Sequence, residues 1–121
     1  MSVKQFNKVK GDGGEAIACD FLEKNGYQIV KRNWRGKGGE IDIIAKKNDV
    51  LHFVEVKMRE NDDYGTGRFA VGLRKQANIR RLASLFLIEQ GLYDQVFCCF
   101  DVLEINGTFD SYTVEHLENC F

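Results

Sequence analysis

Residues 39–57 read GEIDIIAKKNDVLHFVEVK, and this stretch decides the fold. Two apolar runs flank Asn48-Asp49, a dipeptide that is typical of a tight hairpin turn. The runs predict two neighbouring strands, over residues 40–46 and 50–58. Both runs are largely apolar, which is typical of central strands that are covered on both faces of a sheet.

Each predicted strand carries an acid within its apolar run, Asp42 in the first and Glu55 in the second. Burying a lone carboxylate is costly unless something compensates its charge. A two-residue turn would place Asp42 opposite Glu55 and Glu40 opposite Lys57, with all four side chains on one face. Directly opposed like charges destabilise a sheet, so either one carboxyl is protonated or a cation lies between them. Carboxylates with few other ligands suit Mg²⁺ or Mn²⁺.

Lys57 adds a positive charge two positions after Glu55. An amine there could stabilise charge on a phosphate, and a metal ion with a lysine is a hydrolytic arrangement. The alternative is a surface hairpin whose acids pair with Lys57 and nearby arginines. Glu40 is open between two roles, metal ligand or partner of Lys57. Glu15, in the first turn of a predicted helix, is either a further ligand or an acid favoured by the helix dipole.

The whole chain of 121 residues predicts a single domain with the order α-β-β-β-α-β-β. This order indicates a mixed α/β fold, with a central five-stranded sheet flanked by helices. Helices are expected over residues 13–25 and 71–90, with further strands over 27–34, 95–105 and 108–114. Other expectations concern the connections: a flexible segment over residues 1–10, a helix cap at Asp12, a flexible basic loop over residues 35–39, and a hairpin turn at Asn106-Gly107.

Charge is distributed unevenly along the chain, although the net charge is −1. Residues 1–90 hold all 17 Lys and Arg residues but only 12 of the 18 acids. A basic face suited to nucleic acid is therefore compatible with a net charge near zero. The alternative is ordinary surface scatter. No apolar run is long enough for a bilayer or typical of a signal peptide, so we expect a cytoplasmic protein with no membrane partner. The four cysteines show no CxxC spacing and are expected to be buried thiols.

The stretch GEIDIIA at residues 39–45, followed by VEVK at residues 54–57, resembles the PD-(D/E)XK nuclease motif. The fuller pattern resembles the bacterial YraN-like family, which is related to archaeal Holliday-junction resolvases. This short motif alone is prone to false matches, and its combination with flanking pieces in order is much more specific. Cys99 stands where the pattern has an arginine, which puts any contact of that arginine in doubt. The flanking pieces cover nearly the whole chain: Gly14-Glu15-Ala16, Gly26-Tyr27, Arg32-Asn33, Tyr64-Gly65, Lys75-Gln76, Phe100-Asp101-Val102 and Asn119-Cys120-Phe121.

The resemblance implies a restriction-endonuclease-like core and a Mg²⁺-dependent (or Mn²⁺-dependent) endonuclease acting on DNA, with branched or junction DNA as a candidate substrate. It carries over Asp42 and Glu55 as metal ligands, Lys57 as the catalytic lysine and Glu15 as the helix-borne acid. The alternative is a nucleic-acid-binding module that keeps the fold without turnover, against which the intact acids and lysine argue. A symmetric junction would favour a homodimer. Trp34 either stacks on a base or packs in the core. Candidate contacts to nucleic acid are Arg32, Arg35, Lys37, Arg59, Lys75 and Gln76.

Overall fold

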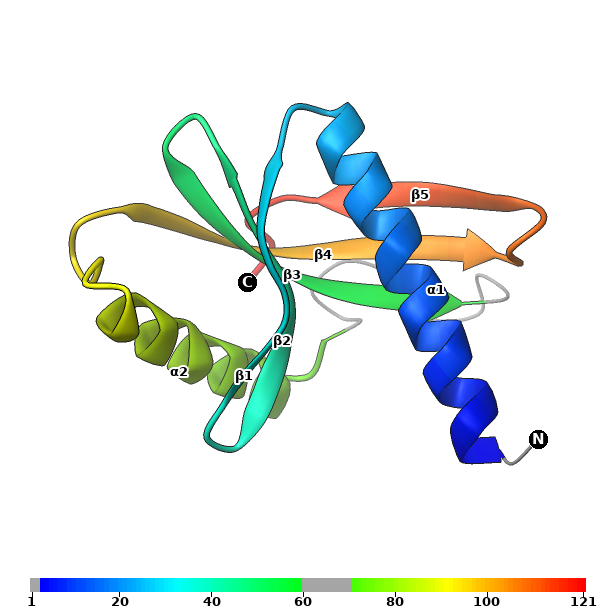
Figure 1. Cartoon of the computed structure of the whole chain (residues 1–121), viewed down its shortest axis with the longest axis horizontal. Helices are drawn as coiled ribbons and strands as arrows, with labels where there is room; N and C mark the ends of the chain where they lie inside the picture. The colour runs from blue at the N-terminus through cyan, green and yellow to red at the C-terminus, as the bar shows by residue number, and fades with distance from the viewer. Residues whose placement is uncertain (1–2, 60–70) are drawn as a thin grey trace.

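A computed structural model describes the backbone of residues 3–59 and 71–121, and the side chains from residue 13 onward within these ranges. A five-stranded sheet carries one helix on each face (Figure 1). Tyr64-Gly65 of the resemblance lies outside the described residues. Within them, no helix is long and apolar enough to cross a lipid bilayer. The elements have the predicted order: α1 (Val3–Lys24), β1 (Gln28–Gly36), β2 (Gly39–Lys47), β3 (Val50–Arg59), α2 (Leu73–Glu89), β4 (Phe97–Gly107) and β5 (Tyr112–Leu117).

The strands lie side by side in chain order, β1-β2-β3-β4-β5. All neighbours are antiparallel except β3 and β4, which are parallel and are joined through α2. In the β2–β3 hairpin, Lys47 pairs with Val50 across Asn48 and Asp49, whose φ angles are 51° and 63°. Positive φ at both central residues is what a type I′ turn requires. The predicted turn and the mixed five-stranded sheet are therefore confirmed.

Helix α1 begins much earlier than the sequence suggested. Its backbone is helical from Val3 through the glycine-rich residues 11–14, so Asp12 lies inside the helix, and the prediction that it caps the helix was wrong. Each glycine lowers helix stability by about 1 kcal/mol relative to alanine but does not forbid a helix. At Gly13 the missing side chain allows close packing, because a Cβ there would lie 2.5 Å from the ring of Phe109. The flexibility expected of residues 1–10 stays a prediction.

Two further hairpins differ from expectation. Residues 35–39 do not form a flexible loop, because β1 continues to Gly36 and β2 begins at Gly39 after a tight turn. The β4–β5 turn is not at Asn106 and Gly107 but spans residues 108–111, with Gly107 paired to Tyr112. Two backbone hydrogen bonds between residues 108 and 111 close this longer turn, which shifts β5 towards the C-terminus.

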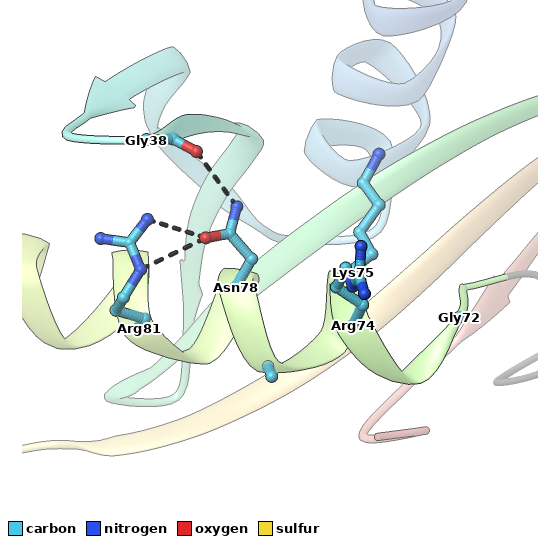
Figure 2. Close-up of a pocket in the computed structure, with 7 residues that line it drawn as sticks. Gly38, Gly72, Arg74, Lys75, Asn78 and Arg81 are labelled. Atoms are coloured by element: carbon cyan, nitrogen blue, oxygen red, sulfur yellow. Dashed lines mark hydrogen bonds between the residues drawn. The ribbon is translucent and has the colours of Figure 1, made fainter.

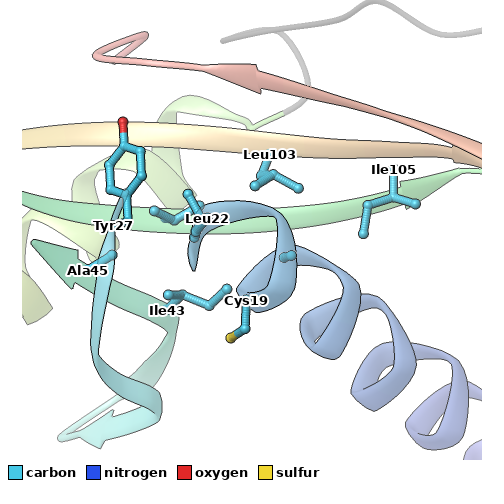
Figure 3. Packing of buried hydrophobic residues seen from close by; sticks show 9 residues of the cluster. Cys19, Leu22, Tyr27, Ile43, Ala45, Leu103 and Ile105 are labelled. Carbon is cyan, nitrogen blue, oxygen red and sulfur yellow. The ribbon is translucent and has the colours of Figure 1, made fainter. Parts of the chain in front are cut away.

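Two apolar clusters hold the helices against the sheet. On one face, Leu22 of α1 is completely buried in a cluster with Leu103 of β4 (Figure 3). On the other face, Phe86 of α2 packs edge-to-face on Phe53 of β3, with ring centroids 6.1 Å apart. Trp34 also packs against Phe86, at 5.4 Å, so its side chain contributes to the core; its stacking on a base stays a prediction. Burial of each such side chain stabilises the fold by roughly 1.5–3 kcal/mol and anchors the strands that carry the acids.

Candidate metal centre

Strands β2 and β3 separate at the point where the predicted acids lie. Their backbone pairing ends at Ile43 and Val54, and beyond this point β2 stays paired with β1. The carboxylate of Asp42 enters the resulting gap and accepts a hydrogen bond from the backbone N–H of Val56 at 2.9 Å. The predicted register is therefore correct up to Ile43. Asp42 and Glu55 then meet through their side chains, not as a backbone pair.

The carboxyl group of Asp42 is crowded by other acids. Burial and the negative charge of Glu55 raise the pKa of Asp42 to about 7, with smaller contributions from Glu15 and from a hydrogen bond to the Glu55 carboxyl. The hydrogen bond from the Val56 N–H offsets only part of this shift. At neutral pH, the site therefore holds either a proton or a positively charged ion.

Three acids from two elements converge here. One carboxylate oxygen each from Glu15 of α1 and from Glu40 and Asp42 of β2 lie within 4.8 Å of one another. Glu15 is only 9% exposed, and its carboxylate lies near the two acids of β2. A set made of carboxylate oxygens matches the ligands that Mg²⁺ and Mn²⁺ prefer. The residues present thus fit a hard divalent cation.

Glu55 is held by two lysines. Its side chain is 5% exposed, and its Oε1 lies 2.6 Å from the Nζ of Lys75 and 3.8 Å from the Nζ of Lys57. Burial lowers the pKa of Lys75, but its hydrogen bond to Glu55 and the surrounding negative charges outweigh this, so the net pKa is raised. Lys75 was predicted as a nucleic-acid contact, and its pairing with Glu55 was missed because no local spacing relates α2 to β3.

Glu40 pairs with Arg35 and not with Lys57. Its Oε2 lies 3.2 Å from the Nε of Arg35, across the β1–β2 pair. The alternative that Glu40 neutralises Lys57 was wrong, because β3 has already separated from β2 at this position. Glu104, which the sequence reasoning missed, is completely buried and lies beside Lys57 in the β3–β4 register. The position of Glu104 within the apolar run of residues 97–105 could have indicated that this acid is buried.

Four of the candidate nucleic-acid contacts are distributed over α2, β1, β3 and the β1–β2 turn. The Nε2 of Gln76 donates a hydrogen bond to the carbonyl of Val71 at 2.8 Å, so this side chain supports the start of α2. Arg32 is exposed on β1. Arg59 ends β3 and is half-buried, and Lys37 lies in the β1–β2 turn.

A groove of about 740 Å³ runs between the β1–β2 turn and α2 (Figure 2). Asn78 connects its two sides: its amide donates to the carbonyl of Gly38 at 3.4 Å and its Oδ1 accepts from Arg81 at 2.7 Å. Lys75 also lines the groove, and its amine pairs with Glu55. The lining is basic, because α2 contributes Arg74, Lys75 and Arg81.

Comparisons with known proteins agree on one family. The model of a family described as "Uncharacterised protein family UPF0102" matches residues 14–105, a range that includes every acid of the cluster. A UPF0102 protein of Clostridium acetobutylicum is 44% identical over 119 residues, which cover 97% of each chain. A UPF0102 protein of Clostridium botulinum (strain 657) is 39% identical over 117 residues, or 95% of each chain.

Proposed function

The chain belongs to the uncharacterised protein family UPF0102, and from its acid cluster we propose that it is a metal-dependent nuclease that hydrolyses phosphodiester bonds in DNA. One observation carries the proposal: acids of α1 and β2 converge where β2 and β3 separate, and Asp42 among them contacts Glu55 of β3, which two lysines flank. The resemblance to PD-(D/E)XK nucleases and junction resolvases supports DNA as the substrate.

The proposed metal ligands are Glu15, Glu40, Asp42 and Glu55, and the ion is Mg²⁺ or Mn²⁺. Bound there, the ion would lower the pKa of a water molecule and polarise a phosphate oxygen. It would also relieve the repulsion that raises the pKa of Asp42. Since all four groups are carboxylates, they offer oxygen ligands that a hard cation prefers.

Lys57 supplies a positive charge to the reaction. Its side chain is 31% exposed, and its amine lies 3.8 Å from Glu55, at the boundary between the buried acids and solvent. A fixed amine in this position stabilises the negative charge that develops on a phosphate during hydrolysis. We assign Lys57 this role and keep the acids as metal ligands.

Lys75 has a different role, because its amine pairs with the Glu55 carboxylate, which is also a proposed metal ligand. Metal binding to Glu55 would release this amine into the groove that Arg74 and Arg81 also line. Three cations along one groove suit the DNA backbone, and phosphate contacts give affinity with little reading of sequence. Recognition of DNA structure is the expected consequence.

The test is a cleavage assay with labelled duplex, single-stranded and four-way-junction DNA, in Mg²⁺, in Mn²⁺ and with a chelator. Glu55→Gln removes a ligand, and Lys57→Met removes the amine while keeping the length of the side chain. Lys24→Met is the matched control, because Lys24 lies at the exposed C-terminal end of α1 and pairs with Asp20. We expect metal-dependent cleavage that each site variant slows by at least about 100-fold.

Three outcomes decide the proposal. Loss of cleavage in Glu55→Gln and Lys57→Met, with the control unchanged, supports it. Cleavage that persists in both site variants contradicts the assigned residues. Binding of DNA without cleavage in either metal overturns the nuclease proposal and favours a nucleic-acid-binding module on the same fold.

A further inference from the structure

A second polar cluster is buried on the face of the sheet that α1 covers. At its centre, Asp101 of β4 is completely buried. Its Oδ2 accepts hydrogen bonds from His52 Nδ1 at 2.6 Å and from His116 Nε2 at 2.8 Å. Its Oδ1 accepts a hydrogen bond from the backbone N–H of Asn119 at 2.8 Å. Two imidazole rings from β3 and β5 thus converge on one carboxylate oxygen.

Cys99 belongs to the same cluster. It precedes Asp101 by two positions on β4, so both side chains are on one face, and it pairs with His52 in the parallel β3–β4 register. The sulfur of Cys99, a ring nitrogen of His52 and a carboxylate oxygen of Asp101 all lie within 4.8 Å of one another. Sequence spacing could not reveal this group, because its members come from three strands.

We propose that His52, Cys99, Asp101 and His116 form a binding site for Zn²⁺ or a similar transition-metal ion. Zinc in proteins takes four ligands from cysteine sulfur, histidine nitrogen and carboxylate oxygen, and this cluster offers all three kinds. A thiolate and a carboxylate together balance the charge of a divalent cation, while the two imidazoles stay neutral. Sulfur and imidazole ligands favour zinc over magnesium.

Zinc binding would require both ring nitrogens to move away from Asp101 Oδ2. With zinc–ligand bonds of about 2.0–2.3 Å, tetrahedral ligand atoms lie roughly 3.3–3.8 Å apart. The distances from Asp101 Oδ2 to the two ring nitrogens, 2.6 and 2.8 Å, are shorter because a proton now bridges each pair. Tyr27 packs edge-on against both imidazole rings, at 5.0 and 5.4 Å between centroids. Its ring therefore shields one side of the cluster from water.

A nucleophilic cysteine is a weaker explanation of the same residues. A reactive cysteine needs a thiolate, and nearby positive charge favours that form. The sulfur of Cys99 instead lies within 4.8 Å of a carboxylate oxygen of Asp101. A bound cation would balance the charges of both the thiolate and this carboxylate.

The proposed zinc site is separate from the acid cluster that contains Asp42 and Glu55. His52 and Glu55 lie three positions apart on β3, roughly 10 Å along the strand, and odd spacing puts their side chains on opposite faces. Its ligands tie together three strands, so the expected role of the ion is to stabilise the fold. The proposal does not depend on the nuclease proposal.

The test uses the full-length protein after removal of metals with a chelator. Titration with Co²⁺ should produce a thiolate-to-cobalt charge-transfer band that saturates at one ion per chain, and Zn²⁺ should displace it and raise the Tm. Cys99→Ser should abolish the band and weaken Zn²⁺ binding by at least about tenfold. Cys98→Ser is the matched control, because the side chain of Cys98 packs on the opposite face of the sheet, in the apolar cluster under α2. Asp42→Asn should also leave the band unchanged.

Several outcomes would overturn the zinc site. Absence of a cobalt–thiolate band in the wild-type protein would leave a hydrogen-bond network only. A band that survives Cys99→Ser, or that Cys98→Ser removes equally, would place the metal elsewhere. If Cys99→Ser does not fold by circular dichroism, His52→Leu provides the second variant. A Zn²⁺ affinity of His52→Leu equal to that of the wild type would also contradict the assignment.

Discussion

Replacing Asp42 with asparagine should stabilise the metal-free protein and remove its stabilisation by metal. The two side chains have nearly the same shape, and the Oδ1 of asparagine can still accept the hydrogen bond that Asp42 takes from the Val56 N–H. Asparagine lacks the charge that burial, Glu55 and Glu15 oppose in the wild type. The substitution therefore tests the electrostatics of the site with little change in packing.

The magnitude follows from the pKa of Asp42, which rises from 3.8 to about 7. A rise of about three units corresponds to at most about 4 kcal/mol. Because the pKa is higher in the folded state, this group's stabilising contribution is present below about pH 4 and is lost as the pH rises towards 7. At pH 8 we expect Asp42→Asn to gain about 1–4 kcal/mol, which raises the Tm by at least roughly 4 °C.

Thermal unfolding followed by circular dichroism measures this effect at pH 5 and pH 8, with a chelator or with excess Mn²⁺. The difference in Tm between Asp42→Asn and the wild type should be larger at pH 8 than at pH 5 in the chelator. Mn²⁺ should then stabilise only the wild type. Asp110→Asn, on the exposed β4–β5 turn, is the control. A lower Tm for Asp42→Asn at pH 8, or equal stabilisation of both proteins by Mn²⁺, would refute the reasoning.

Two other substitutions test neighbouring features. Lys75→Gln removes the amine that competes with metal for Glu55, so Mn²⁺ affinity measured by calorimetry should rise several-fold, corresponding to about 1 kcal/mol for an ion pair whose lysine is half exposed. Arg74→Gln, on the same helical turn, is the control and should leave the Mn²⁺ affinity unchanged. Weaker Mn²⁺ binding by Lys75→Gln would show that the lysine does not compete with the metal. Asp49→Gly relieves a backbone φ of 63° in the β2–β3 turn and should add about 0.5 kcal/mol to the free energy of unfolding in urea, since glycine adopts this conformation without a Cβ penalty. A loss of stability would contradict the type I′ turn.

The sequence predicted the parts of this protein that depend on local pattern. Asn48-Asp49 specified the turn, and the turn specified the register that brings Asp42 towards Glu55. Apolar flanks around both acids indicated burial, and Glu55 is indeed 5% exposed. Alternation along each strand is a local property, so these positions could be placed without knowledge of distant elements.

Contacts between distant elements could not be predicted in the same way. The pairing of Lys75 with Glu55 depends on where the first turn of α2 lies on the sheet, which no spacing encodes. The group of His52, Asp101 and His116 depends on the order of three strands. The early start of α1 was missed because glycines were interpreted as a helix boundary, whereas Gly13 serves close packing.

The rate of DNA cleavage as a function of Mn²⁺ concentration tests the central claim most directly, when the wild type is compared with Glu15→Gln. Glu15 comes from α1, so a change in the Mn²⁺ dependence of the reaction in Glu15→Gln would link helix and sheet acids in one metal centre. We predict no cleavage without metal, a saturable rate in the wild type, and a half-saturating Mn²⁺ concentration at least about tenfold higher for Glu15→Gln. Cleavage without metal, or the same Mn²⁺ dependence in both proteins, would contradict a metal centre built from these acids.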